Sequence, residues 1–146
     1  LLGIATRSAK RAPMEACSEA EVNPNTGVAQ DFRGKPGQRQ VTVLTREAWE
    51  AACAELRENL PWTIRRANLY VEGVDLEEST GKTLVIGEIV LELTGETNPC
   101  YRMDEQHPGL TDALEPHWRG GALGRVVSGG IIRVGDPVTL KSALKA

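Results

Sequence analysis

The chain has 146 residues, of which 40% are hydrophobic and 25% are charged, which is typical of a globular protein that buries an apolar core without disulfides. Its formal net charge of −3 argues against a general attraction to nucleic acid or anionic lipid. Its apolar runs are far shorter than the roughly 20 residues of a membrane helix, and no signal peptide is recognisable. We therefore expect one cytoplasmic domain spanning residues 1–146, with no membrane or nucleic-acid partner.

The first half of the chain predicts two strands separated by a loop, and then a helix. Residues 2–7 could form a short strand, and residues 8–38 are rich in glycine and proline, which favours a loop. The β-branched run 39–44 predicts a strand. Thr45 stands where a helix N-cap would stand, and apolar residues recur at helical spacing over residues 49–60.

The second half predicts strands, because short β-branched runs alternate there with Gly, Asp, Asn or Ser. The expected strands are 67–73, 83–86, 88–94, 123–128 and 131–134. Ser128–Gly130 is expected to form the turn of a hairpin between the last two. Many short strands with glycine at their corners favour a mainly β fold with a few helices (α+β), arranged as a closed or partly open β-barrel.

The three cysteines lie far apart, contain no CxxC pair and are odd in number, so neither a disulfide framework nor a zinc knuckle is indicated. Cys53 falls on the apolar stripe of the predicted helix and is expected in the core. Cys17 lies in the predicted loop and is expected to have no special role.

Cys100 is the candidate reactive residue. It follows Asn98 and Pro99 directly after a predicted strand, and reactive groups are often placed on such loops. Pro99 restricts the backbone before the thiol, and a guanidinium at Arg102 would favour the thiolate, which binds soft metals. Its position alone leaves open that Cys100 is a small, buried and unreactive side chain.

Two groups of basic residues form a second candidate site. Their members are Arg33, Lys35 and Arg39 in the early loop, and Arg65 and Arg66 beside Asn68. Guanidinium groups could bind a phosphate or a pterin through paired hydrogen bonds. The alternative is that these charges solvate the surface or pair with Asp31 and Glu72.

Two further patterns indicate sites less well. A metal site of Cys100, His107 and His117 is conceivable, but the spacing matches no known structural zinc site. The glycine-rich segment 119–130 lacks the GK[ST] ending of a phosphate loop and leads into a strand, so turns explain it better. No Ser/His/Asp arrangement is recognisable.

Several segments, in order, resemble the MOSC family, the domain also found at the end of molybdenum cofactor sulfurases. They are TGVAQDFRG, RQVTVL, RRANLYVEG, GKTLVIGEIVLELTGETNPC and RGGALGRVVSGGIIRVGDPV. The resemblance covers nearly the whole chain. The chain departs from the family at Gln30, where many members have glycine before the aspartate that corresponds to Asp31.

The resemblance implies a β-barrel and a cysteine that carries sulfur or ligates molybdenum beside a pterin cofactor. Cys100 matches that cysteine, as catalytic residue and metal ligand, and Arg66 and Asn68 match the family's Arg-x-Asn segment. Arg39 resembles the family residue that opens the corresponding strand. The cofactor-binding residues implied in this way, or expected from their adjacency to Cys100, are Arg39, Arg66, Asn68, Asn98 and Arg102.

The resemblance leaves the reaction open. One function is reduction of N-hydroxylated compounds at the molybdenum cofactor (molybdopterin), with electrons from a partner such as a cytochrome or an iron–sulfur protein. The alternative is a sulfur carrier or cofactor-delivery module that holds a persulfide on Cys100 without redox chemistry. A third is an interaction domain that only retains the scaffold. At the level of the family, pyridoxal phosphate binding is also implied.

Overall fold

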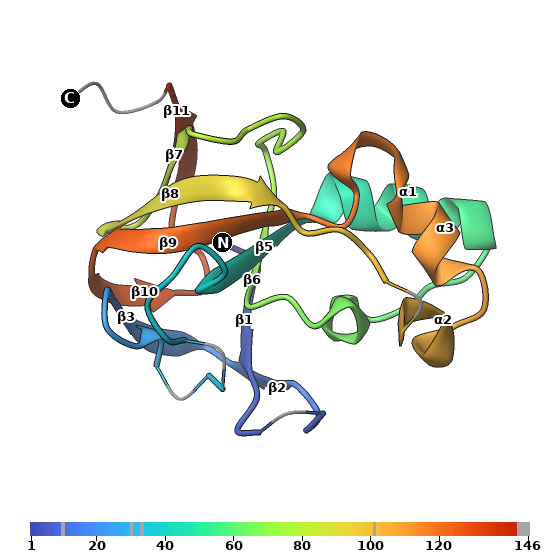
Figure 1. The fold of residues 1–146 in the computed structure, drawn as a ribbon, viewed down its shortest axis with the longest axis horizontal. Coiled ribbons are helices and arrows are strands. Elements are labelled where there is room, and N and C mark those ends of the chain that lie inside the picture. The colour runs from blue at the N-terminus through green and yellow to red at the C-terminus, as the bar shows by residue number, and fades with distance from the viewer. Residues whose placement is uncertain (10, 30, 33, 101, 143–146) are drawn as a thin grey trace.

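A computed structural model describes residues 1–9, 11–29, 31–32, 34–100 and 102–142. This part of the chain is mainly β with a few helices (Figure 1). Its strands are β1 (Gly3–Thr6), β2 (Glu15–Cys17), β3 (Glu19–Asn23), β4 (Gly27–Val28), β5 (Val41–Thr45), β6 (Leu69–Val71), β7 (Thr83–Ile86), β8 (Ile89–Glu96), β9 (Ala122–Ser128), β10 (Gly130–Arg133) and β11 (Val138–Lys141). Its helices are α1 (Arg46–Leu56), α2 (Arg102–Gln106) and α3 (Leu110–Leu114), with 3-10 helices η1 (Trp62–Arg65) and η2 (Pro116–Trp118).

The strands form two sheets. The larger has the order β11-β7-β8-β9-β5-β6-β1-β2 and the smaller the order β10-β3-β4. Neighbouring strands are antiparallel except for β5 and β6, which are parallel. Helices α1, α2 and α3 gather at one end of β5, β8 and β9 (Figure 1). No pairing among the described strands joins β11 to β2, so the mainly β class is confirmed and a closed barrel stays a prediction.

The core has two parts. The larger is built from apolar side chains of strands in both sheets, including Ile4, Val22, Leu91 and Ile132, all fully buried. The second lies under the helices, where Trp49 of α1 and Leu110 of α3 pack together with residues of α2. The helices therefore pack closely against one end of the larger sheet.

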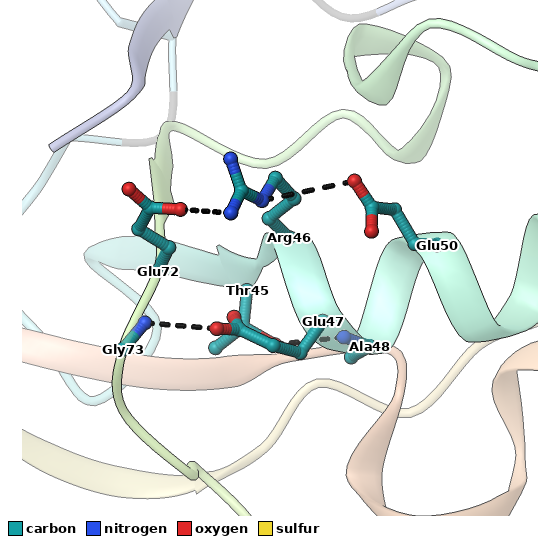
Figure 2. Close-up of polar contacts among 7 residues, drawn as sticks. All are labelled: Thr45, Arg46, Glu47, Ala48, Glu50, Glu72 and Gly73. Atoms are coloured by element: carbon teal, nitrogen blue, oxygen red, sulfur yellow. Dashed lines mark hydrogen bonds and ion pairs between the residues drawn. The ribbon is translucent and has the colours of Figure 1, made fainter.

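The start of α1 is tied to the sheet through polar contacts, which Figure 2 shows for Thr45, Arg46, Glu47, Ala48, Glu50, Glu72 and Gly73. Thr45 Oγ1 accepts a hydrogen bond of 3.1 Å from Ala48 N, which confirms the predicted N-cap. Glu47 accepts a bond of 2.9 Å from the backbone N–H of Gly73. α1 ends at Leu56, before the predicted boundary.

The predicted strands from residue 39 onward are confirmed to within a few residues, and so is the strand in residues 2–7. The prediction of one loop over residues 8–38 is wrong, because it contains β2, β3 and β4. These strands are short, and β2 is exposed along its whole length, so the alternation that marks a half-buried strand is missing. β11 and the short helices α2 and α3 were not predicted either.

The predicted hairpin at Ser128–Gly130 is wrong. β9 pairs with β8 and β5, whereas β10 pairs with β3. The chain thus passes from one sheet to the other at this point, and Gly129 allows the crossing because a Cβ there would lie 2.5 Å from the carbonyl oxygen of Val22. Within the described residues, no helix is long and apolar enough to cross a membrane.

Candidate functional site

A cleft of about 270 Å³ lies beside the carboxyl end of β8. Its lining residues are Arg7, Asp31, Arg39, Thr42, Arg65, Arg66, Asn68, Thr97, Asn98, Cys100, Arg102, Met103 and Leu123. All six predicted site residues are among them, although they come from three segments far apart in the chain. The tertiary structure therefore brings the predicted residues together, and their binding of a cofactor remains a proposal.

Cys100 lies between β8 and α2, and its side chain is exposed, which excludes the interpretation of a buried thiol. The carbonyl oxygen of Cys100 accepts hydrogen bonds from Met103 N, at 2.9 Å, and from Thr111 Oγ1, at 2.8 Å. These bonds tie its backbone to α2 and α3. The thiol is thus accessible on a backbone that is fixed.

Arg65 also lines the cleft, although it is not one of the six predicted site residues. Only 7% of its surface is exposed. Its guanidinium donates from Nε to the carbonyl of Gly120 and from Nη2 to that of Thr97, both at 2.9 Å, and Nη1 lies 3.7 Å from the sulfur of Met103. Burial lowers the pKa of Arg65 to about 10, opposed by its attraction to Cys100. Arg65 is therefore a buried cation at neutral pH.

The glycine-rich segment after η2 makes room for that cation. A Cβ on Gly120 would lie 2.4 Å from Thr97 O and 3.1 Å from Arg65 Nη2. A Cβ on Gly121, whose φ is +101°, would lie 2.2 Å from Val43 O. Close backbone approach therefore explains these glycines, in agreement with the preference for turns over a phosphate loop.

Arg66 and Asn68 have different surroundings in the cleft. Arg66 adopts a left-handed φ of +67°, which is unusual for a residue with a side chain, and its Nη2 donates to the carbonyl of Ala12. Asn68 is buried, and its Oδ1 accepts from Thr42 N at 3.0 Å and from Thr42 Oγ1 at 3.1 Å, while Nδ2 donates to Ala5 O at 3.3 Å. Asn68 thus joins β1 and β5 from within the cleft wall.

The loop that precedes β5 is held by Gln40, whose side chain is buried. Its Nε2 donates to Pro24 O at 2.8 Å and to Gly34 O at 3.0 Å, and its Oε1 accepts from Val126 N at 2.9 Å. These three bonds tie the loop before β5 to the turn between β3 and β4 and to β9. The neighbouring Arg39 is exposed at the cleft.

The charge of the cleft is strongly positive although the chain as a whole is negative. Five arginines line it, at positions 7, 39, 65, 66 and 102, together with one carboxylate, Asp31. Asp31 Oδ1 accepts a hydrogen bond from Arg7 N at 3.1 Å. The hydroxyl of Thr97 is buried and has no hydrogen-bond partner among the described residues. The cleft is therefore suited to an anionic ligand with polar groups.

Known proteins share this architecture. The family model of the MOSC domain matches residues 21–139. This chain belongs to the MOSC family. The YuaD protein of Bacillus subtilis has the same fold, with a TM-score of 0.81 at 18% identity over 97% of this chain and 94% of that one.

Two further structures with a similar fold are those of YiiM from Escherichia coli and from Geobacillus stearothermophilus. Both are 16% identical to this chain, with TM-scores of 0.71 and 0.73. The alignments cover 99% and 95% of this chain, and 70% and 73% of the two YiiM chains. At these identities the likeness shows the fold alone. No curated protein matches the sequence.

The other sequence-based candidates lie elsewhere in this MOSC fold. His117 contacts Glu77, and His107 contacts the carbonyl of Pro108. No group of three potential metal-ligating His, Cys, Asp or Glu residues occurs in the described part of the chain, so the site of Cys100 with both histidines is not formed. Cys53 is buried in the core, as predicted.

The early basic group is divided by the fold. Arg39 lines the cleft, and Lys35 lies with Phe32 in an adjoining shallow hollow. Arg33 and Gln30 lie outside the described residues. The departure of this chain from the family at Gln30 therefore remains an observation on the sequence alone.

Proposed function

We propose that this MOSC protein binds the molybdenum cofactor in the cleft and that Cys100 is the ligand of the metal. The observation that carries the proposal is an exposed thiol in a cleft lined by five arginines. The family is associated with molybdenum cofactor binding. The donor set fits this group, because thiolates prefer soft metals and guanidinium groups bind phosphate in pairs of hydrogen bonds.

Each part of the cleft has a role in this proposal. Arg39, Arg66 and Arg102 would hold the phosphate and the polar edge of the pterin, and Asn98 is exposed beside Cys100. The buried Thr97 hydroxyl lacks a partner among the described residues and could donate to the same ligand. Asn68 uses its carbonyl oxygen within the protein, so its main contribution would be to hold the cleft wall in place.

When bound, the cofactor would supply two-electron redox chemistry at the metal. The proposed reaction is the reduction of an N-hydroxylated compound, in which the N–O bond takes up two electrons and two protons and yields the N–H compound and water. A one-electron carrier protein, such as a cytochrome or an iron–sulfur protein, would provide the electrons. Cys100 and the arginines would bind and orient the reacting groups.

The alternative is that Cys100 carries sulfur. Its exposure favours this, because another protein could reach the thiol. The Cys100 thiolate would attack the outer sulfur of a donor persulfide, so that a new S–S bond forms on Cys100 and the donor leaves as a thiol. Pyridoxal phosphate fits less well, because none of the described residues that line the cleft is a lysine and this cofactor is usually bound as a lysine Schiff base.

The deciding experiment measures molybdenum and pterin in the protein purified from a host supplied with molybdate. The wild type should contain near-stoichiometric molybdenum, and Cys100→Ser should lose it because a hydroxyl is a poor ligand for a soft metal. Cys17→Ser is the matched control, since Cys17 is also exposed but lines a different hollow. It should keep the metal.

Two outcomes would contradict the ligand assignment. If Cys100→Ser keeps its molybdenum, another residue holds the metal. If the wild type contains neither metal nor pterin, and mass spectrometry finds roughly 32 Da added at Cys100 that a thiol reductant removes, sulfur carriage is the better function, because a sulfinic acid of the same nominal mass would not be reduced.

A further inference from the structure

Arg65 contacts residues on both sides of Cys100 in the chain, which cofactor binding alone does not require. Its guanidinium contacts Thr97, three residues before Cys100, and Met103, three residues after it. Its Nε donates to the carbonyl of Gly120, in the turn before β9. A single buried side chain therefore connects both flanks of the Cys100 segment to the central strands.

The guanidinium also has capacity left for a ligand. It carries five N–H groups, and its contacts with protein atoms use one on Nε, one on Nη2 and one on Nη1. Within the part of the chain that the structure describes, two N–H groups remain without an acceptor, on a side chain that is 7% exposed and lines the same cleft as Cys100. A buried donor without a partner is costly, so an acceptor in the cleft would relieve that cost.

The charges of the two residues interact. Attraction to Cys100 favours the protonated form of Arg65. Because Arg65 is buried, water screens this interaction less than it would at the surface. A negative group bound next to the Cys100 sulfur would be attracted in the same way.

We propose that Arg65 is a positioning residue for Cys100: it holds the loop on both sides of the thiol and attracts an anionic group to the space beside the sulfur. The inference rests on the proposed function only in taking Cys100 as the reactive group. It holds equally for a metal ligand and for a sulfur carrier, so it can fail or succeed independently of molybdenum binding.

The test compares two alkylating reagents of similar size on the full chain, produced without molybdate. The thiolate displaces iodide from the CH₂ carbon of either reagent, but iodoacetate carries a negative charge and iodoacetamide does not. We expect the ratio of the iodoacetate rate to the iodoacetamide rate to be higher at Cys100 than at Cys17. The difference should be on the order of tenfold, as for a hydrogen bond to a charged group. Peptide mass spectrometry measures both sites in the same molecules.

The variants separate charge from geometry. Arg65→Met should lose most of the preference for iodoacetate, and Arg65→Lys should retain part of it, because the charge remains but one ammonium cannot reproduce the planar fork. Gly120→Ala should also reduce the preference, since its Cβ would displace the Thr97 carbonyl and the guanidinium. Arg46→Met is the control and should leave the ratio unchanged, because Arg46 is an exposed arginine of α1 that pairs with Glu72 (Figure 2) and is not among the residues that line the cleft.

A purely structural role for Arg65 would change the rates of both reagents alike and leave their ratio unaltered. The proposal is wrong if the wild type shows no preference at Cys100, or if folded Arg65→Met retains it. If circular dichroism shows that Arg65→Met does not fold, Arg65→Lys and Gly120→Ala decide, and an unchanged ratio in both overturns the proposal.

Discussion

Gln40 shows how single side chains shape the cleft without occupying it. Only 2% of its surface is exposed, and its amide bonds one backbone group each in the turn between β3 and β4, in the loop before β5 and in β9. Asn68 does the same between β1 and β5. Buried amides of this kind are costly unless they are bonded, so they fix one loop arrangement and exclude others. Arg39, its neighbour in the chain, lines the cleft.

Replacing Gln40 by leucine should lower the free energy of unfolding by about 2–4 kcal/mol, because it leaves buried backbone groups without partners. Urea denaturation measures the loss. Gln38→Leu is the matched control: Gln38 is exposed, and we expect a change within about 0.5 kcal/mol. Equal effects of the two substitutions would show that the three bonds of Gln40 do not stabilise the loop.

At the scale of elements, the junction of β9 with β5 determines the shape of the site. Gly121 precedes β9 with a φ of +101°, and its Cα faces the carbonyl oxygen of Val43 in β5. The same turn carries Gly120, which accepts the hydrogen bond from Arg65. The strand pairing and the position of the buried cation therefore depend on the same two residues.

Gly121→Ala should cost more than about 3 kcal/mol, since it combines a disfavoured φ with overlap against a strand carbonyl. Gly81→Ala separates the two effects, because Gly81 has a φ of +86° but open space around its Cβ direction. We expect it to cost about 1 kcal/mol. Thermal denaturation of both variants gives the comparison, and a similar loss in both would show that backbone strain alone is responsible.

At the scale of the whole molecule, the fold changes the pH at which the partly buried phenol of Tyr70 ionises. Tyr70 of β6 stacks on Trp62 of η1, with ring centroids 5.0 Å apart. Burial, followed by repulsion from Glu50, raises the pKa of Tyr70 to about 12 from 10.0. Between these values the phenol ionises in the unfolded chain but stays neutral in the folded protein.

The unfolded state therefore binds fewer protons in this window, and Tyr70 lowers the stability of the fold as the pH rises from about 10 to about 12. Below about pH 10 this loss is absent. Tyr70→Phe keeps the ring but cannot ionise, so its stability should fall less steeply over the same range. Urea midpoints at about pH 8 and about pH 11 test this, and parallel curves for the two proteins would contradict it.

Local sequence patterns were sufficient to predict much of the fold. The strands β5 to β10, the helix α1 and its cap at Thr45 all follow from periodicity and capping preferences, which neighbouring residues set. Resemblance to the family led to Cys100 and to the segment of Arg66 and Asn68. The short strands β2 to β4 were missed because two to five residues are too few to show a periodic signal, and β2 is exposed along its whole length.

The sequence by itself thus determined the mainly β class, the family and the loop position of Cys100. Only the tertiary structure decided which of the many arginines share one cleft with that thiol, that Arg65 is buried among them, and that the chain crosses between sheets at Gly129. The physical reason is that burial and strand pairing depend on segments far apart in the chain, whereas periodicity and capping report only on residues that are neighbours along it.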